Sequence, residues 1–111
     1  MGDSGSLGHL EQLIMWSLVR LRDKAYGVSI QQDIEERAGK DVSLGSIYTT
    51  LSRLEEKGLV SSRLGEPSAE RGGRAKKFFR IEAAGATALS ESRRALTSIW
   101  SGLRPLKGTA L

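Results

Sequence analysis

The chain has 111 residues, which suffice for one small domain with one hydrophobic core. It contains no cysteine and a single histidine, so a disulfide framework and a thiolate metal site are excluded and strong metal ligands are too few. No apolar run approaches the ~20 residues of a membrane-spanning helix, and the N-terminus lacks the features of a signal peptide. We therefore expect a soluble cytoplasmic protein with no cofactor and no membrane partner.

Charge is distributed unevenly along the chain. The formal net charge is +4, but residues 1–60 carry seven Lys and Arg against nine Asp and Glu, whereas residues 61–111 carry ten against four. Residues 71–80 hold five basic side chains, no acidic one and two adjacent glycines. Such a cluster favours a polyanionic partner, although clusters of cations also occur on surfaces that only promote solubility.

Two helices are predicted in the first part of the chain. Over about 10–22, several leucines, among them Leu13, and one isoleucine recur on one face of the helix. A second group of apolar residues surrounds Trp16. This helix has more apolar surface than one neighbour would need. A second helix follows Tyr26 and ends at Gly39, a residue suited to a left-handed cap.

The segment VSLGSIYTTLSRLEEKGLV, residues 42–60, has the clearest helical pattern. Ser43 is a suitable N-cap, and Gly58 is expected to end the helix. The side opposite the apolar one carries small and hydroxylated residues. Within this segment no acidic residue precedes Glu55. It is either an ordinary solvated face or a surface that can approach phosphates and base edges. The core positions predicted for this helix are Leu44, Ile47, Leu51 and Leu54.

After this helix the pattern becomes that of a β-hairpin followed by one more helix. Residues 59–64 and 76–81 alternate as strands around a turn-rich loop. The last helix, over about 82–103, has an apolar side that so small a globule cannot cover, so we expect a homodimer. The residues expected at the dimer interface are Leu13, Trp16, Leu89, Leu96, Ile99, Trp100 and Leu103.

The order of helix, helix, helix, strand, basic loop, strand and helix is that of a winged helix-turn-helix, a mainly α fold with a small β-hairpin. In this fold the third helix enters the major groove and the hairpin tip, the wing, lies along the DNA backbone or minor groove. We expect a flexible leader (1–9), a winged-helix DNA-binding domain (10–81), a C-terminal dimerisation helix (82–104) and a frayed tail (105–111).

Three stretches, AYGVSIQQDIEER, SLGSIYTTLSRLEEKGLVSS and ERGGRAKKFFRIEAAGATAL, resemble the PadR family of bacterial transcriptional regulators. The most specific parts are G-x-x-Y-x-x-L-x-R-L-E-x-x-G-L, beginning at Gly45, and the G-G-R-x-K segment that begins at Gly72. The resemblance implies a dimeric winged-helix repressor that binds a palindromic operator in double-stranded DNA. The DNA-contact residues that it implies are Ser43, Gly45, Ser46, Tyr48, Thr49 and Arg53 on the third helix, and Arg71, Gly73, Arg74 and Lys76 on the wing.

The chain departs from the family pattern in two ways. Phenylalanines stand at 78 and 79, where the family often has tyrosines, and one helix follows the hairpin, as in the short subgroup that lacks a larger sensing domain. Some short members place a tryptophan in a pore between subunits, where it stacks on flat aromatic compounds. By that resemblance Trp100, with Trp16, is a candidate effector site. The alternative is that both tryptophans only anchor the dimer interface.

Enzyme readings find little support in the sequence. The GDSG of residues 2–5 echoes the nucleophile motif of trypsin-like proteases, but that fold needs a far longer chain, and a triad needs a base held in place. The single histidine, His9, lies in the same leader. The alternative to a DNA-binding regulator is a winged-helix protein-interaction module whose basic hairpin binds an acidic partner.

Overall fold

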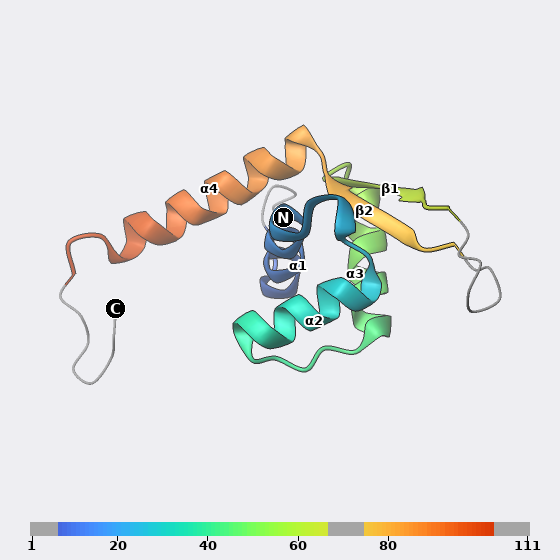
Figure 1. Cartoon of the computed structure of the whole chain (residues 1–111). Helices are drawn as coiled ribbons and strands as arrows, with labels where there is room; N and C mark the ends of the chain where they lie inside the picture. Colours follow the sequence, from blue (N-terminus) through green and yellow to red (C-terminus); the bar gives the residue numbers. More distant parts are fainter. Residues whose placement is uncertain (1–6, 67–74, 104–111) are drawn as a thin grey trace.

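The computed structural model describes residues 7–66 and 75–103. Three helices, α1 (His9–Leu21), α2 (Gly27–Ala38) and α3 (Leu44–Glu56), pack together, and a short 3-10 helix, η1 (Arg22–Lys24), follows α1. Strands β1 (Val60–Leu64) and β2 (Lys77–Ile81) form an antiparallel hairpin. Helix α4 (Ala83–Trp100) then extends away from the three-helix body, on the side opposite the two strands (Figure 1). This is the winged helix-turn-helix predicted from the sequence.

Local hydrogen bonds explain where the helices begin. The Gly8 N–H donates to the Glu11 carboxylate at 2.9 Å at the start of α1, and the Tyr26 N–H donates to Ser29 Oγ at 2.9 Å at the start of α2. Ser43 is the N-cap of α3, as predicted, because its Oγ accepts the Ser46 N–H at 3.1 Å. These bonds satisfy amides that have no partner within the helix.

Glycines end the second and third helices, as predicted. Gly39 follows α2 with φ +66°. Gly58 follows α3 with φ +76°, and the next N–H, that of Leu59, donates back to the Leu54 carbonyl at 3.0 Å. A residue without a side chain adopts this left-handed conformation at little steric cost. The chain can therefore turn sharply from α3 into β1.

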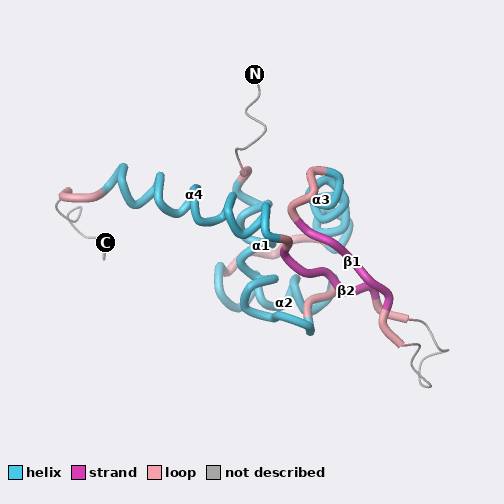
Figure 2. Tube along the Cα trace, turned by 90° about the horizontal axis from the view of Figure 1, so that it is seen from above, coloured by secondary structure: helices cyan, strands magenta, loops and turns pink. Residues whose placement is uncertain are grey.

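The hairpin is joined to the helical body along one edge. In its register Val60 pairs with Ile81 and Arg63 pairs with Phe78. Tyr26 forms an isolated antiparallel bridge with Phe78, and the Phe79 N–H donates to the Ala25 carbonyl at 2.9 Å. The residues just before α2 therefore act as a short third strand, which Figure 2 shows as the close approach of that loop to the hairpin.

The core lies between α1, α2, α3 and the hairpin. Ile47, Leu51 and Leu54 of α3 are fully buried, as predicted, but Leu44 is 36% exposed. Leu44 is the first residue of α3, and the buried part of the helix begins one turn later at Ile47. It also includes Thr50. The other buried apolar residues are Leu7, Ile14, Met15, Leu18, Ala25, Ile30, Ile34, Val60, Phe79 and Leu89.

Two expectations for the ends of the chain need correction. Leu7, expected in a flexible leader, is buried in the core, and the leader residues 1–6 lie outside the described residues. Leu89, expected at a dimer interface, is only 2% exposed because the first turns of α4 pack on their own chain. Gly85 makes this possible, since a Cβ there would collide with the Leu59 carbonyl. The predicted tail, 105–111, also lies outside the described residues.

Within the part of the chain that the structure describes, no helix is both long enough and apolar enough to span a membrane.

Candidate nucleic-acid interface

The outer face of α3 is open to solvent along its whole length. All the contact residues predicted on this helix are exposed, and none of them is acidic. The amides of the first turn point outward at the N-terminal end, where the helix dipole favours an anion. The face therefore combines small groups and hydroxyls with one cation and one carboxylate near the C-terminal end. Its exposed residues are Ser43, Gly45, Ser46, Tyr48, Thr49, Ser52, Arg53 and Glu56.

The C-terminal end of α3 is fastened to the body by polar contacts. Lys57 Nζ lies 2.9 Å from the Glu11 carboxylate of α1, and the Ser62 hydroxyl of β1 donates to the Glu55 carboxylate at 2.7 Å. Burial raises the pKa of Glu11, but hydrogen bonds from Lys57 and the Gly8 N–H, with the charges of Lys57 and Arg53, outweigh it and hold the pKa below its ordinary value of 4.5. The orientation of α3 is thus tied to α1 and to the hairpin.

The base of the wing carries a stack of two cations and two aromatic rings. Lys76 Nζ lies 4.3 Å from the centroid of the Tyr26 ring, and the Arg63 guanidinium lies 4.8 Å from that of Phe78. The two rings meet edge to face, with centroids 5.6 Å apart. The cations are thereby held at the exposed edge of the hairpin. Three further predicted wing contacts, Arg71, Gly73 and Arg74, lie outside the described residues.

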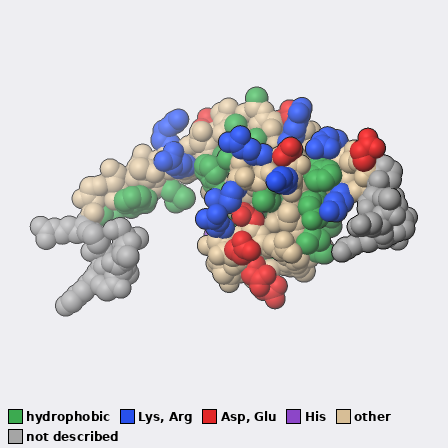
Figure 3. Space-filling model, viewed as in Figure 1, with side chains coloured by type: hydrophobic (Ala, Val, Ile, Leu, Met, Phe, Trp, Pro, Cys, Tyr) green, Lys and Arg blue, Asp and Glu red, His purple; other side chains and the backbone are tan. Residues whose placement is uncertain are grey.

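Two residues of this stack, Arg63 and Tyr26, were not among the DNA-contact residues predicted from the sequence. Arg63 could have been found, since strand alternation together with the pairing of 59–64 with 76–81 puts it beside an aromatic residue. Tyr26 could not, because only the fold brings it against Phe78. Figure 3 shows lysines and arginines spread over the face formed by α1 and the hairpin.

A buried carboxylate joins α1 to α2 behind the interface. The Ser17 hydroxyl donates to Asp33 Oδ2 at 2.7 Å, and Arg20 Nε lies 3.1 Å from Asp33 Oδ1. Both Ser17 and Asp33 are buried. A serine inside an otherwise apolar face was the only sequence signal of this contact. It fixes the packing of the helix that precedes α3.

The two tryptophans meet in one groove between α1 and α4. The groove has a volume of about 390 Å³, and its remaining lining residues are Gln12, Arg93, Leu96 and Thr97. Trp16 is 36% exposed and Trp100 is 53% exposed. Beyond the groove, the apolar side of α4 continues through the exposed Ile99 and, after the helix ends, Leu103. This side of α4 is visible as hydrophobic groups along its lower edge in Figure 3.

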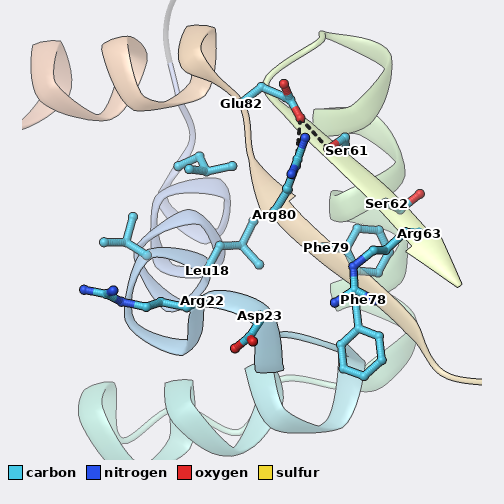
Figure 4. A pocket seen from close by; sticks show the side chains of 12 residues that line it. Leu18, Arg22, Asp23, Ser61, Ser62, Arg63, Phe78, Phe79, Arg80 and Glu82 are labelled. Carbon is cyan, nitrogen blue, oxygen red and sulfur yellow. Dashed lines mark hydrogen bonds and ion pairs between the residues drawn. The ribbon is translucent and has the colours of Figure 1, made fainter. Parts of the chain in front are cut away.

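A wider groove of about 900 Å³ lies between the end of α1, η1 and the hairpin (Figure 4). Its upper rim holds Glu82, which accepts a hydrogen bond from Ser61 and lies 3.5 Å from Arg80 Nε. The Ser61 hydroxyl, aided by the charge of Arg80, keeps the pKa of Glu82 below its ordinary value. In Figure 4, Arg80 points toward Glu82 and Arg22 points away from the groove, so the charged groups do not converge on one point.

The described residues contain no cluster suited to bind a metal ion. No group of three or more His, Asp or Glu within 7–66 and 75–103 is arranged to hold a metal ion. His9 is the first residue of α1 and is exposed, and the GDSG of residues 2–5 lies outside the described residues.

Comparison with known proteins identifies a family of transcriptional regulators and a similar protein. The model of the transcriptional regulator PadR-like family matches residues 17–91. The chain is 38% identical over 77 residues to the transcriptional regulator Rv3488 of Mycobacterium tuberculosis, which covers 69% of this chain and 67% of that protein.

Two solved structures of PadR family regulators have the same fold. One, from Clostridium difficile R20291, superimposes with a TM-score of 0.66 at 24% identity, covering 84% of this chain and 95% of that one. The other, from Eggerthella lenta, gives a TM-score of 0.66 at 25% identity, covering 91% of this chain and 88% of that one.

Proposed function

The chain belongs to the PadR-like family of transcriptional regulators, and we propose that it represses transcription by binding a palindromic operator as a homodimer. Membership makes it a DNA-binding regulator and not an enzyme. In the proposed complex, α3 lies in the major groove and the wing follows the DNA backbone. The DNA-contact residues of α3 are proposed to be those predicted from the sequence.

The observation that carries this proposal is the combination of two surfaces. The outer face of α3 offers small and hydroxylated side chains without a carboxylate in its first three turns, and the wing base beside it presents Lys76 and Arg63. The small and hydroxylated side chains of α3 can approach base edges. The cations at the base of the wing can displace counterions from the phosphates. We assign sequence preference to α3 and salt-dependent affinity to the wing.

The exposed apolar side of α4 supports the homodimer. Leu96, Ile99 and Trp100 leave much of their surface in water although the helix is apolar along this side. A second copy packed against α4 and α1 would remove this area from water. Two-fold symmetry then sets the half-sites about one helical turn of DNA apart, or a multiple of that.

A gel shift with the DNA upstream of the protein's own gene tests the proposal. We expect saturable binding that unrelated competitor DNA does not remove, with affinity that falls as salt rises. Arg74→Ala should weaken binding to every sequence and flatten the salt dependence, whereas Arg94→Ala on α4 serves as the matched control cation. Binding that competitor DNA abolishes would instead favour the protein-interaction module with an acidic partner.

For regulation, we propose that a planar aromatic effector enters the groove between Trp16 and Trp100. Two indole rings beside the apolar Leu96 offer stacking surface at a place where a second copy would meet the groove. Titration of a Trp16→Phe variant with a panel of phenolic acids and aromatic drugs isolates the emission of Trp100. Unchanged emission together with unchanged DNA affinity across the panel would leave the tryptophans as interface anchors only.

A further inference from the structure

Gly27, the first residue of α2, is buried against a side chain of α3. A Cβ at position 27 would lie 2.5 Å from Cζ and 2.9 Å from Cε2 of the Tyr48 ring, and closer still to the hydroxyl. A real Cβ atom essentially never lies this close to another heavy atom. The tip of the Tyr48 ring therefore occupies the space that any other residue at 27 would fill.

Tyr48 belongs to the exposed face of α3 as well as to this contact. It is 42% exposed, so one part of the ring lies on the first turn of α2 and the rest borders the surface proposed to meet DNA. The tyrosine has only two side-chain torsions, and contact with α2 restricts both of them. The missing side chain at Gly27 thus sets where the Tyr48 hydroxyl is presented.

The neighbouring residue makes the corresponding contact with the wing. The Tyr26 backbone bridges to Phe78, its ring meets the Phe78 ring edge to face, and Lys76 lies over it. Adjacent residues therefore contact both surfaces of the proposed interface. A change in this dipeptide would alter the position of a recognition-helix side chain relative to the wing cations.

We propose that Gly27 is a specificity-determining residue of the DNA interface, which acts by positioning Tyr48. The inference rests on the proposed DNA reading by α3. Gly27→Ala should displace the Tyr48 ring while leaving the fold intact, because the obstructed group is the free end of a partly exposed side chain. Alanine is otherwise more favourable than glycine within a helix.

The test compares Gly27→Ala with Gly8→Ala, a glycine at the start of α1 where the nearest atom to a new Cβ would be Glu11 Oε1 at 3.8 Å. The probe is the duplex that the wild-type protein enriches from a random-sequence pool, with an unrelated duplex of equal length beside it. We expect Gly27→Ala to lose about tenfold in affinity for the enriched duplex and less than about twofold for the unrelated one. Gly8→Ala should match the wild type on both.

Two further readouts separate positioning from a general loss of structure. The NMR resonances of the Tyr48 ring should shift in Gly27→Ala, and selection with this variant should enrich a different sequence. In a Tyr48→Leu background, which removes the ring, adding Gly27→Ala should change DNA affinity by less than about twofold. This comparison also holds if Gly27→Ala alone folds poorly.

Retention of wild-type affinity and of the wild-type enriched sequence by Gly27→Ala would overturn the inference, as would a larger additional loss in the Tyr48→Leu background. Failure of the wild-type protein to enrich any sequence would overturn the proposed function itself. The two failures are therefore distinguishable.

Discussion

The contact between Glu11 and Lys57 should contribute measurably to stability, and Glu11→Gln tests it. The carboxylate side chain is 9% exposed and lies 2.9 Å from Lys57 Nζ, which is 32% exposed. A hydrogen bond to a charged group is worth about 1.5–3 kcal/mol, but a lysine that can turn to water recovers part of the loss. We expect Glu11→Gln to lower the free energy of unfolding by about 1–2 kcal/mol at neutral pH.

The effect should depend on pH in a direction that follows from the lowered pKa. Because the pKa of Glu11 is below 4.5 in the folded chain, folding favours the ionised form. The contribution is therefore complete above the ordinary value and is lost as the pH falls through the lower folded-state value. The difference between wild type and Glu11→Gln should shrink over that interval and disappear below it.

Urea unfolding followed by circular dichroism measures these quantities, at one fixed protein concentration because association would add to the apparent stability. A double-mutant cycle with Lys57→Met isolates the pair, and we expect a coupling free energy of about 1 kcal/mol. A coupling near zero would refute the assignment of this contact. So would a Glu11→Gln difference that stays constant from neutral pH to about pH 3.

Three further outcomes are expected. Asp33→Ala should lower the free energy of unfolding by about 2–4 kcal/mol, because it leaves the buried Ser17 hydroxyl without its partner. Arg37 lies 3.9 Å from Asp33 and is largely exposed, so Arg37→Ala should lower it by less than about 0.5 kcal/mol. Thermal melting measures both effects. Leu51→Ala, at a fully buried position, should cost about 3–5 kcal/mol in the same assay. Thr49→Ala should leave the melting temperature within about 2 °C of wild type yet change the sequence enriched from a random pool.

Local signals were sufficient to predict most of the secondary structure. The serine cap and the apolar period of α3, the glycines after α2 and α3, and the alternation on either side of the basic loop all act between residues close in sequence. The resulting order of elements predicted the winged helix-turn-helix. The exposure of the α3 contact face followed from the same period, since the opposite side had to supply the core.

Packing decided what the helical period left open. Leu44 and Leu89 both lie on apolar sides of their helices, yet the first is partly exposed and the second is buried. Periodicity reports which side of a helix is apolar but not how far along its length a neighbour extends. Close packing on the chain's own body covers only the first turns of α4. Leu96, which lines the groove beside α1, and Ile99 therefore remain exposed, whereas Leu89 is buried.

The contacts that unite the interface were decided by the tertiary structure alone. Tyr26 meets Phe78, Gly27 receives Tyr48, and Glu11 meets Lys57 across separations of many residues. Hydrophobic period and capping act within a few residues of the chain, whereas these contacts exist only after three helices and a hairpin have closed around one core. The sequence by itself therefore determined which helix and which hairpin face outward, and the fold determined how one is held relative to the other.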